Sequence, residues 1–343
     1  MDGMESRKGH RVAVFGAAGH TGRFVIAELL RRGLTPIAVG RDAAGLAALE
    51  GVERRVASIE DPASLDRAFA GAAAVINGAG PFLETAEAVA AAAIRAGIPY
   101  LDVTAEQASA SALFDRFDAD ARRAGVILIP AMGFYGGLAD LLVTSAMGEW
   151  DSADAIEIGI ALDSWHPTRG TRITGARNTA PRLAIEQGAL VPIALPAATR
   201  AWDFPPPFAR QTVVELPFSE VILISRHLRT GTLHTHLNET ALNDIRDPAT
   251  PAPVAVDASG RSAQRFLVEA VVTRGADRRR IAAQGQDIYA FSAPLICEAV
   301  ERLLDGRFQG VGVQAPGAAF DAPDFLGALG CAIASDSENN FRQ

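Results

Sequence analysis

The sequence predicts an α/β protein in which a doubly wound parallel sheet is joined to a second α+β domain with an open, mostly antiparallel sheet. Three observations carry this prediction. A glycine-rich turn follows the apolar run at residues 11–15, the first 140 residues alternate between strand-like and helix-like segments, and a long hairpin pattern occupies residues 265–283. Because strands that alternate with helices form parallel sheets with right-handed crossovers, the first part is predicted to be a Rossmann domain.

The first part of the chain is predicted to hold strands and helices in strict alternation. The predicted strands cover residues 12–15, 36–39, 55–57, 73–76, 100–103 and 126–129, and the predicted helices cover 21–32, 43–49, 63–70, 85–96 and 107–124. Asp42 and Asp61 precede two of these helices as N-caps, because an aspartate oxygen accepts hydrogen bonds from a first helical turn. Gly97 and Gly125 end two others, since glycine takes up the left-handed backbone that stops a helix.

The second part is predicted to be an α+β domain. A strand at 155–161 is followed by a helix at 171–187, by several strands, and by the hairpin 265–274 and 278–283. A further helix at 292–304 is expected to pack back onto the first part. The predicted domains are therefore residues 1–150 with 286–343, for the dinucleotide, and residues 151–285, for substrate and dimerisation. The two ends, 1–9 and 335–343, are expected to fray.

Composition narrows the class of protein. The net charge of −8 argues against binding to nucleic-acid backbones, which needs a basic face. No apolar stretch is long enough to span a membrane, and the charged first ten residues lack the apolar core of a secretory signal. Two cysteines make no disulfide framework. We therefore expect a cytoplasmic protein that acts on a small molecule, with no nucleic-acid partner and no membrane insertion, and a homodimer through the second domain.

The glycine-rich turn is the strongest functional signal in the chain. Gly16, Gly19 and Gly22 lie between a predicted strand and a predicted helix, where backbone N–H groups and the helix dipole bind a pyrophosphate. His20 and Thr21 are placed to hydrogen-bond a phosphate. The alternatives are a sharp turn that binds nothing and, for His20, a solvated loop side chain.

The end of the second predicted strand bears on the choice of cofactor. It runs Gly40-Arg41-Asp42, without an acid at the position where an NAD enzyme binds the ribose hydroxyls. The Arg41 guanidinium pairs with a 2′-phosphate in a forked, charge-assisted geometry, so NADP(H) is favoured over NAD. In the competing interpretation, Asp42 binds the ribose, and Arg41 stacks on the adenine or lies at the surface.

Small residues follow the fourth predicted strand, at Asn77-Gly78-Ala79-Gly80. Ligands bind at the carboxyl ends of parallel strands, so this turn is expected to lie against the nicotinamide ribose, and a turn made tight only for packing is the alternative. The fifth strand ends near Thr104. The predicted cofactor-binding residues are Gly16, Ala17, Ala18, Gly19, His20, Thr21, Gly22, Arg41, Asn77, Gly78, Ala79, Gly80 and Thr104.

Taken together, these motifs resemble the saccharopine dehydrogenase-like (saccharopine reductase) NAD(P)-binding oxidoreductases. The resemblance rests on the glycine turn, Gly40-Arg41, the runs 75–82 and 96–104, and Gly133-Phe134, and it covers about residues 11–140. It implies an NADPH-dependent oxidoreductase, since similar proteins include imine-forming amino-acid dehydrogenases and enoyl reductases. The chain departs from the family pattern at Ala105, where a glycine often precedes the glutamate, and it lacks an arginine set suited to a substrate with three carboxylates.

Tyr135, His166 and Arg169 are the candidates for substrate chemistry. Tyr135 follows the sixth predicted strand, where a phenol donates a proton or packs between domains. His166 and Arg169 precede a predicted helix, in a loop suited to an anionic substrate or to an exposed turn. His234 and His236 alternate on a predicted strand but have no third ligand, so no metal is predicted.

Two functions of different class are compatible with these residues. The first is hydride transfer from NADPH to a polarised C=N or C=C bond in a cleft between the domains. The second is a redox-silent NADP-binding protein that regulates a partner or acts as a scaffold. The second is retained because the acid–base pair of short-chain dehydrogenases is missing, and the only lysine of the chain is Lys8.

Overall fold

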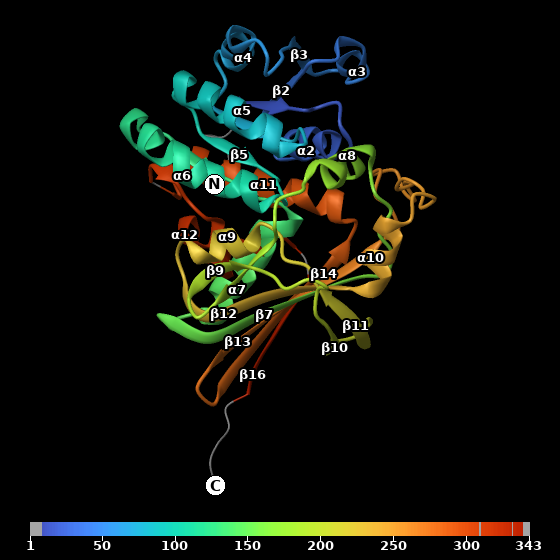
Figure 1. Cartoon of the computed structure of the whole chain (residues 1–343). Coiled ribbons are helices and arrows are strands. Elements are labelled where there is room, and N and C mark those ends of the chain that lie inside the picture. The colour runs from blue at the N-terminus through green and yellow to red at the C-terminus, as the bar shows by residue number, and fades with distance from the viewer. Residues whose placement is uncertain (1–8, 309, 331, 339–343) are drawn as a thin grey trace.

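The computed structural model of the chain describes residues 9–308, 310–330 and 332–338. Two sheets lie at opposite ends of the molecule, with helices between and around them (Figure 1). The first sheet is parallel, in the order β15-β6-β5-β4-β1-β2-β3. Its strands are β1 (Arg11–Phe15), β2 (Thr35–Gly40), β3 (Glu53–Val56), β4 (Ala74–Asn77), β5 (Tyr100–Asp102), β6 (Ile127–Ile129) and β15 (Gly312–Val313). The predicted Rossmann architecture is confirmed, with β15 as an additional strand that the sequence pattern did not indicate.

Helices cover both faces of the parallel sheet. One face carries α4 (Pro62–Phe69), α5 (Phe82–Ala96) and α6 (Gln107–Ala124), and the other carries α2 (His20–Arg31), α3 (Ala43–Ala47) and α11 (Ile288–Leu304). Alternate residues of β1 supply the two cores, since Val12 and Val14 join one cluster and Ala13 and Phe15 join the other. This two-sided burial explains why the strands read as continuous apolar runs.

Capping residues confirm three of the predicted helix ends. Asp42 accepts a hydrogen bond from the Ala44 amide at 3.1 Å, and Asp61 accepts one from the Ser64 amide at 3.2 Å. Gly97 follows α5 in a left-handed conformation, with φ of 68°. These ends were predictable because each depends on a local hydrogen bond or on one backbone angle.

The second sheet is mixed, in the order β10-β11-β12-β7-β13-β14-β16, with β8 and β9 attached beside β12. Its strands are β7 (Ser152–Leu162), β8 (Leu183–Glu186), β9 (Ala189–Pro192), β10 (Thr199–Asp203), β11 (Arg210–Glu215), β12 (Arg229–Asn238), β13 (Arg265–Arg274), β14 (Asp277–Gln286) and β16 (Ala332–Glu338). Neighbouring strands are antiparallel except β12 and β7, which run parallel. The predicted second, mostly antiparallel sheet and its hairpin, β13–β14, are confirmed.

The C-terminal segment contributes to both sheets. Strand β15 extends the parallel sheet, whereas β16 pairs with β14 in the mixed sheet. The prediction of a frayed end is therefore wrong for residues 335–338, which have backbone partners in β14. Residues 1–8 and 339–343 lie outside the described residues.

The predicted helix at 171–187 is wrong in its second half. Helix α8 (Arg169–Arg177) ends at Asn178, and Leu183–Glu186 forms strand β8 instead. Pro181 has no N–H and disfavours helical backbone in the residue before it. Beyond Pro181, Ile185 is buried and pairs with β12, so an extended backbone is favoured there.

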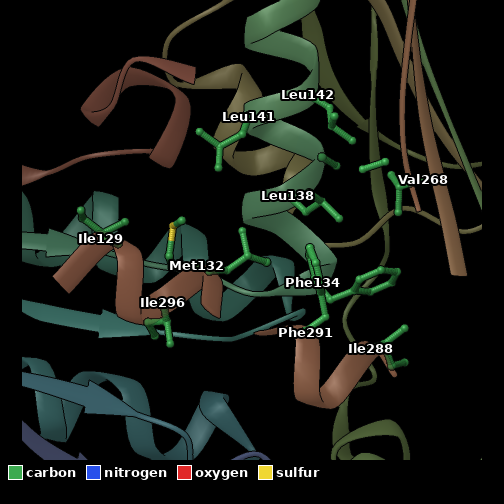
Figure 2. Packing of buried hydrophobic residues seen from close by; sticks show 14 of the residues in the cluster. Ile129, Met132, Phe134, Leu138, Leu141, Leu142, Val268, Ile288, Phe291 and Ile296 are labelled. Atoms are coloured by element: carbon green, nitrogen blue, oxygen red, sulfur yellow. The ribbon is translucent and has the colours of Figure 1, made fainter. Parts of the chain in front are cut away.

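One hydrophobic cluster joins the two sheets. Figure 2 shows Leu138 and Leu142 pointing toward Val268 of β13 and Leu141 pointing away from it, with Ile296 of α11 in the same cluster. Five helices of this part were not predicted, namely α7 (Ala139–Met147), α9 (Glu220–Ser225), α10 (Glu239–Arg246), α12 (Pro316–Ala319) and α13 (Ala322–Ala328). The turn that leads from β6 into α7 is thus held between the sheets. In the described part of the chain, no helix is long and apolar enough to cross a membrane.

Candidate functional site

The glycine turn joins β1 directly to α2. Gly16 has φ of 84°, and a Cβ atom there would lie 2.8 Å from the Ala79 Cβ atom. A Cβ atom on Gly22 would lie 2.2 Å from the Gly16 carbonyl oxygen, so only glycine lets α2 start this close to the turn. The first turn of α2 has no side-chain cap and no acidic residue. Its N–H groups and its positive dipole end are therefore available to an anion.

His20 is packed at the start of α2. Its ring meets Phe24 and Tyr289 edge-to-face, each at 5.3 Å between centroids. Among the described residues, its Nε2 atom is buried without a hydrogen-bond partner. Burial lowers the pKa of His20, against the opposing charge of Asp287. The turn therefore carries a neutral imidazole with one unused nitrogen, which fits a polar ligand.

The end of β2 presents Arg41 to solvent. Arg41 is exposed, and it makes no hydrogen bond or ion pair with any residue that the structure describes. Asp42 instead caps α3 through its bond to the Ala44 amide. The arrangement leaves the guanidinium available to an added phosphate and commits one oxygen of the carboxylate to the helix.

Asn77 shapes the turn that follows β4. Its amide nitrogen donates to Thr85 Oγ1 at 3.2 Å and to the Tyr100 hydroxyl at 3.3 Å, and its oxygen accepts from the Ala79 amide at 3.0 Å. The side chain is fully buried. Gly78 donates to the Phe15 carbonyl at 2.8 Å, which ties this turn to the end of β1. Asn77 thus supports Gly78–Gly80 from behind.

Asp102 joins the ends of β5 and β6. One carboxylate oxygen accepts from the Thr104 amide at 2.9 Å and from the Ala131 amide at 2.8 Å, and the other accepts from the Tyr100 hydroxyl at 2.8 Å. Thr104 is fully buried, and its hydroxyl accepts from the Glu106 amide at 3.0 Å. The predicted residue Thr104 therefore supports the site from inside, as Asn77 does.

The titration of Asp102 gives a testable dependence of stability on pH. Burial raises the pKa of Asp102 to about 6 from its usual 3.8. The folded carboxyl therefore keeps its proton at pH values where the unfolded one loses it. We expect the free energy of unfolding to fall as pH rises from about 4 to about 6, by up to about 3 kcal/mol. Denaturant unfolding at several pH values measures this slope.

The variant Asp102→Asn is expected to remove that slope. Its oxygen can accept from both amides, and its nitrogen can donate to the Tyr100 hydroxyl, so the network survives without a charge. At pH 7 the variant should be more stable than the wild type by about 2 kcal/mol. Asp61→Asn is the control, because asparagine also caps a helix. An unchanged slope in Asp102→Asn would contradict the assignment.

Tyr135 lies in the turn after β6. Its ring packs between Phe218, at 4.2 Å, and Trp165, at 5.4 Å between centroids. Its hydroxyl is buried without a hydrogen-bond partner among the described residues. Burial raises the pKa of Tyr135 well above its usual value, so the hydroxyl stays protonated at neutral pH. The Tyr135 ring therefore packs between the two parts of the chain, and its hydroxyl carries a proton that it donates to no described residue. These features correspond to the two roles that the sequence left open.

Gly136 allows Tyr135 to take this position. Its φ is 121°, and a Cβ atom there would lie 2.6 Å from Ser219 Oγ. The Ser219 hydroxyl lies 2.8 Å from the Thr104 carbonyl oxygen and 3.0 Å from the Tyr135 carbonyl oxygen. A serine of the second part thus holds together the ends of β5 and β6.

The other two predicted residues are His166, in the loop between β7 and α8, and Arg169, the first residue of α8. His166 is half-buried and Arg169 is exposed, and neither has a hydrogen bond or ion pair with the described residues. Trp165 connects this loop to Tyr135 by ring packing. The backbone next to His166 is therefore linked to Tyr135 through the Trp165 ring.

Helix α8 lies against the turn at the end of β4. A Cβ atom on Gly80 would lie 3.0 Å from Thr174 Oγ1, and Arg177 forms an ion pair with Glu84 at the start of α5. Figure 1 shows α8 next to the parallel sheet, although it follows a strand of the mixed sheet. None of its residues is buried. The second part of the chain thus covers the turn after β4 with a helix that is weakly packed.

Two supporting residues were not found by sequence reasoning. The Glu106 carboxylate accepts from the Phe82 and Leu83 amides, at 3.1 and 2.8 Å, and so caps α5 beside the turn. The Tyr289 hydroxyl bonds to the loop before α8. Neither role is visible in a local pattern, because each residue acts on a segment far away in the sequence.

The pair His234 and His236 lies on β12, with 6.5 Å between ring centroids. His234 Nδ1 lies 2.7 Å from Glu215 Oε1. In the described ranges, no group of three or more His, Cys, Asp or Glu side chains is arranged to hold a metal ion.

Part of this chain is similar in sequence to a known protein family. The sequence profile of a family described as NAD(P)H-binding matches residues 16–117, the part that contains the glycine turn and the ends of β2, β4 and β5. That part of the chain is similar to NAD(P)H-binding domains. No curated protein sequence matches the chain.

Among solved structures, apo saccharopine dehydrogenase (L-Glu forming) from Saccharomyces cerevisiae is similar over almost the whole chain. The TM-score is 0.69 at 11% identity, with 96% of this chain and 100% of that chain covered. The chain has the saccharopine dehydrogenase fold. A meso-dapdh mutant with DAP from Clostridium tetani E88 is similar with a TM-score of 0.50 at 11% identity, over 89% of this chain and 93% of that one. The resemblance drawn from the sequence motifs is thus confirmed at the level of the fold, including the middle part, where the motifs fade.

Proposed function

We propose that the protein is an NADPH-dependent oxidoreductase that transfers a hydride to a polarised C=N or C=C bond of a small molecule. The observation that carries the proposal is the meeting of the uncapped glycine turn with the Tyr135 turn and the α8 loop at one end of the parallel sheet. Ligands of doubly wound sheets bind at this end. The similarity to dehydrogenases of the same fold supports the reaction class.

The residues present fit a nicotinamide dinucleotide. The N-terminus of α2 and the turn Gly16–Gly22 would hold the pyrophosphate, and Gly78–Gly80 leaves room for a ribose against the backbone. The unpartnered Nε2 atom of His20 offers a further polar contact. When bound, the cofactor supplies the hydride, and the chain supplies position, exclusion of water and the proton.

Arg41 is proposed to select NADPH over NADH. We expect Arg41→Ala to weaken NADPH binding by about 1.5–3 kcal/mol, the range for a hydrogen bond to a charged group, and to leave NADH binding nearly unchanged. Titration of each cofactor against the purified variant measures both values. Arg67→Ala, which removes an exposed arginine of α4, is the control. An equal loss for both cofactors, or no loss, would contradict the 2′-phosphate assignment.

On the substrate side, Tyr135 is proposed as the proton donor, with His166 and Arg169 binding an anionic group of the acceptor. The Tyr135 hydroxyl has no described hydrogen-bond partner, and His166 and Arg169 make no described hydrogen bond or ion pair. Oxidation of NADPH with a panel of imines, enones and ketones tests the reaction. If the protein binds NADPH but consumes none, the redox-silent regulatory function is the better description.

The assembly and the location of the protein stay predictions. A homodimer through the mixed sheet is expected to give twice the monomer mass by light scattering. A cytoplasmic location is expected from the cysteine content and is tested by fractionation of cells that express the protein.

A further inference from the structure

We propose that Tyr289 is a positioning residue that couples the binding of NADPH at the glycine turn to the ordering of the segment that carries His166 and Arg169. The inference rests on the proposed binding of NADPH at that turn. It concerns how the two halves of the site are aligned, and it needs no knowledge of the acceptor.

The hydroxyl of Tyr289 contacts the loop before α8 and the first turn of α8 at three points. It lies 3.1 Å from Trp165 Nε1, 3.3 Å from the Thr168 amide nitrogen and 2.9 Å from Thr171 Oγ1. His166 lies between the first two of these points in the sequence, and Arg169 lies between the last two. A single oxygen atom thus contacts one backbone amide and two side chains that flank the two candidate substrate residues in the sequence.

The ring of Tyr289 faces the cofactor side. It packs edge-to-face on His20, the first residue of α2, at 5.3 Å between centroids. Its own helix, α11, lies along α2, and the Asp287 carboxylate caps that helix by accepting from the Tyr289 and Ala290 amides at 3.0 Å each. The ring is therefore anchored to the Rossmann part, while its hydroxyl holds the second part.

Several contacts order the α8 segment. The Trp165 amide donates to the Asp244 carboxylate at 2.7 Å, and Arg172 donates to the Thr250 carbonyl oxygen at 2.7 Å. The helix itself has no buried residue, and the exposed Arg177–Glu84 ion pair contributes little. Among these contacts, the Tyr289 hydroxyl connects the segment to the ring that packs on His20. A ligand that orders His20 is expected to restrict the Tyr289 ring, and with it the loop.

Hydrogen exchange of residues 163–178, with and without NADPH, tests the proposal on the full-length protein. In the wild type, NADPH is expected to slow exchange of this segment severalfold. In Tyr289→Phe, the segment should exchange about 2- to 10-fold faster, as expected for a lost hydrogen bond, and NADPH should no longer slow it. NADPH affinity should stay within a factor of about three, since the phenyl ring still packs on His20.

Two further variants sharpen the test. Thr171→Val removes one partner of the same hydroxyl and should weaken the NADPH effect in the same direction, even if Tyr289→Phe fails to fold. Tyr135→Phe is the matched control, because that hydroxyl has no described partner and its loss should leave the exchange response intact.

The outcomes separate this inference from the proposed function. A purely structural role for Tyr289 would speed exchange equally with and without NADPH, and that result would overturn the inference. So would NADPH binding that leaves the wild-type loop unprotected. Failure of the wild type to bind NADPH would overturn the proposed function, and this inference with it.

Discussion

Replacing Gly22 by alanine is expected to weaken NADPH binding by on the order of 100-fold or more and to destabilise the protein by about 1–3 kcal/mol. The added Cβ atom would lie 2.2 Å from the Gly16 carbonyl oxygen and 2.8 Å from the Ala17 Cα atom. Both neighbours are backbone atoms of the turn itself, so no side chain can rotate away. Relief requires α2 to move from the turn, which displaces the N–H groups that would hold the pyrophosphate.

Cofactor titration and denaturant unfolding measure the two effects of Gly22→Ala. Gly327→Ala is the matched control, since Gly327 lies in helix α13 with nothing within 4 Å of an added Cβ atom. Alanine favours helices over glycine by up to about 1 kcal/mol, so the control should be neutral or stabilising. A Gly22→Ala protein that binds NADPH as the wild type does would remove the turn from the cofactor site.

Removing the hydroxyl of Tyr135 is expected to raise stability and to abolish most of the activity. An unpaired buried hydroxyl costs free energy, so Tyr135→Phe should increase the free energy of unfolding by about 1 kcal/mol. Loss of a general acid should lower kcat on the order of 100-fold, with NADPH affinity unchanged. The rate is measured with an acceptor from the imine, enone and ketone panel.

Tyr100→Phe gives the opposite result for stability and serves as the comparison. The Tyr100 hydroxyl donates to Asp102 at 2.8 Å and lies 3.3 Å from the Asn77 amide nitrogen, so its removal should destabilise the fold by about 1–2 kcal/mol. If Tyr135→Phe gains stability and keeps full turnover, Tyr135 is an interdomain packing residue, and the proton comes from another group.

The cofactor half of the candidate site was largely predictable from local sequence. The turn Gly16–Gly22 follows its strand directly, and Gly40-Arg41 follows the next one, so each motif is contained in a few consecutive residues. The substrate half was predictable only as separate pieces. His166 and Tyr135 lie in different parts of the chain, and the link between them is Trp165, the neighbour of His166, whose ring packs against Tyr135.

Some predicted residues take a different place from the one their motif indicated. Asn77 and Thr104 stand at strand ends, where a ligand is expected, yet both side chains are fully buried and bonded to neighbouring turns. A sequence pattern shows that a polar residue ends a strand, but it does not show which way the side chain points. For Asn77 that direction follows from Tyr100, which lies on another strand, whereas for Thr104 the partner Glu106 lies only two residues further along the same turn.

By itself, the sequence determined the Rossmann architecture, the glycine turn and most helix ends, because strand periodicity, glycine backbone angles and capping depend on neighbouring residues. The tertiary structure decided the rest. It ended α8 at Asn178, brought residues 335–338 into the mixed sheet, and placed Tyr289 between the cofactor turn and the substrate loop. These features come from burial and hydrogen bonds between distant segments, which no local pattern encodes.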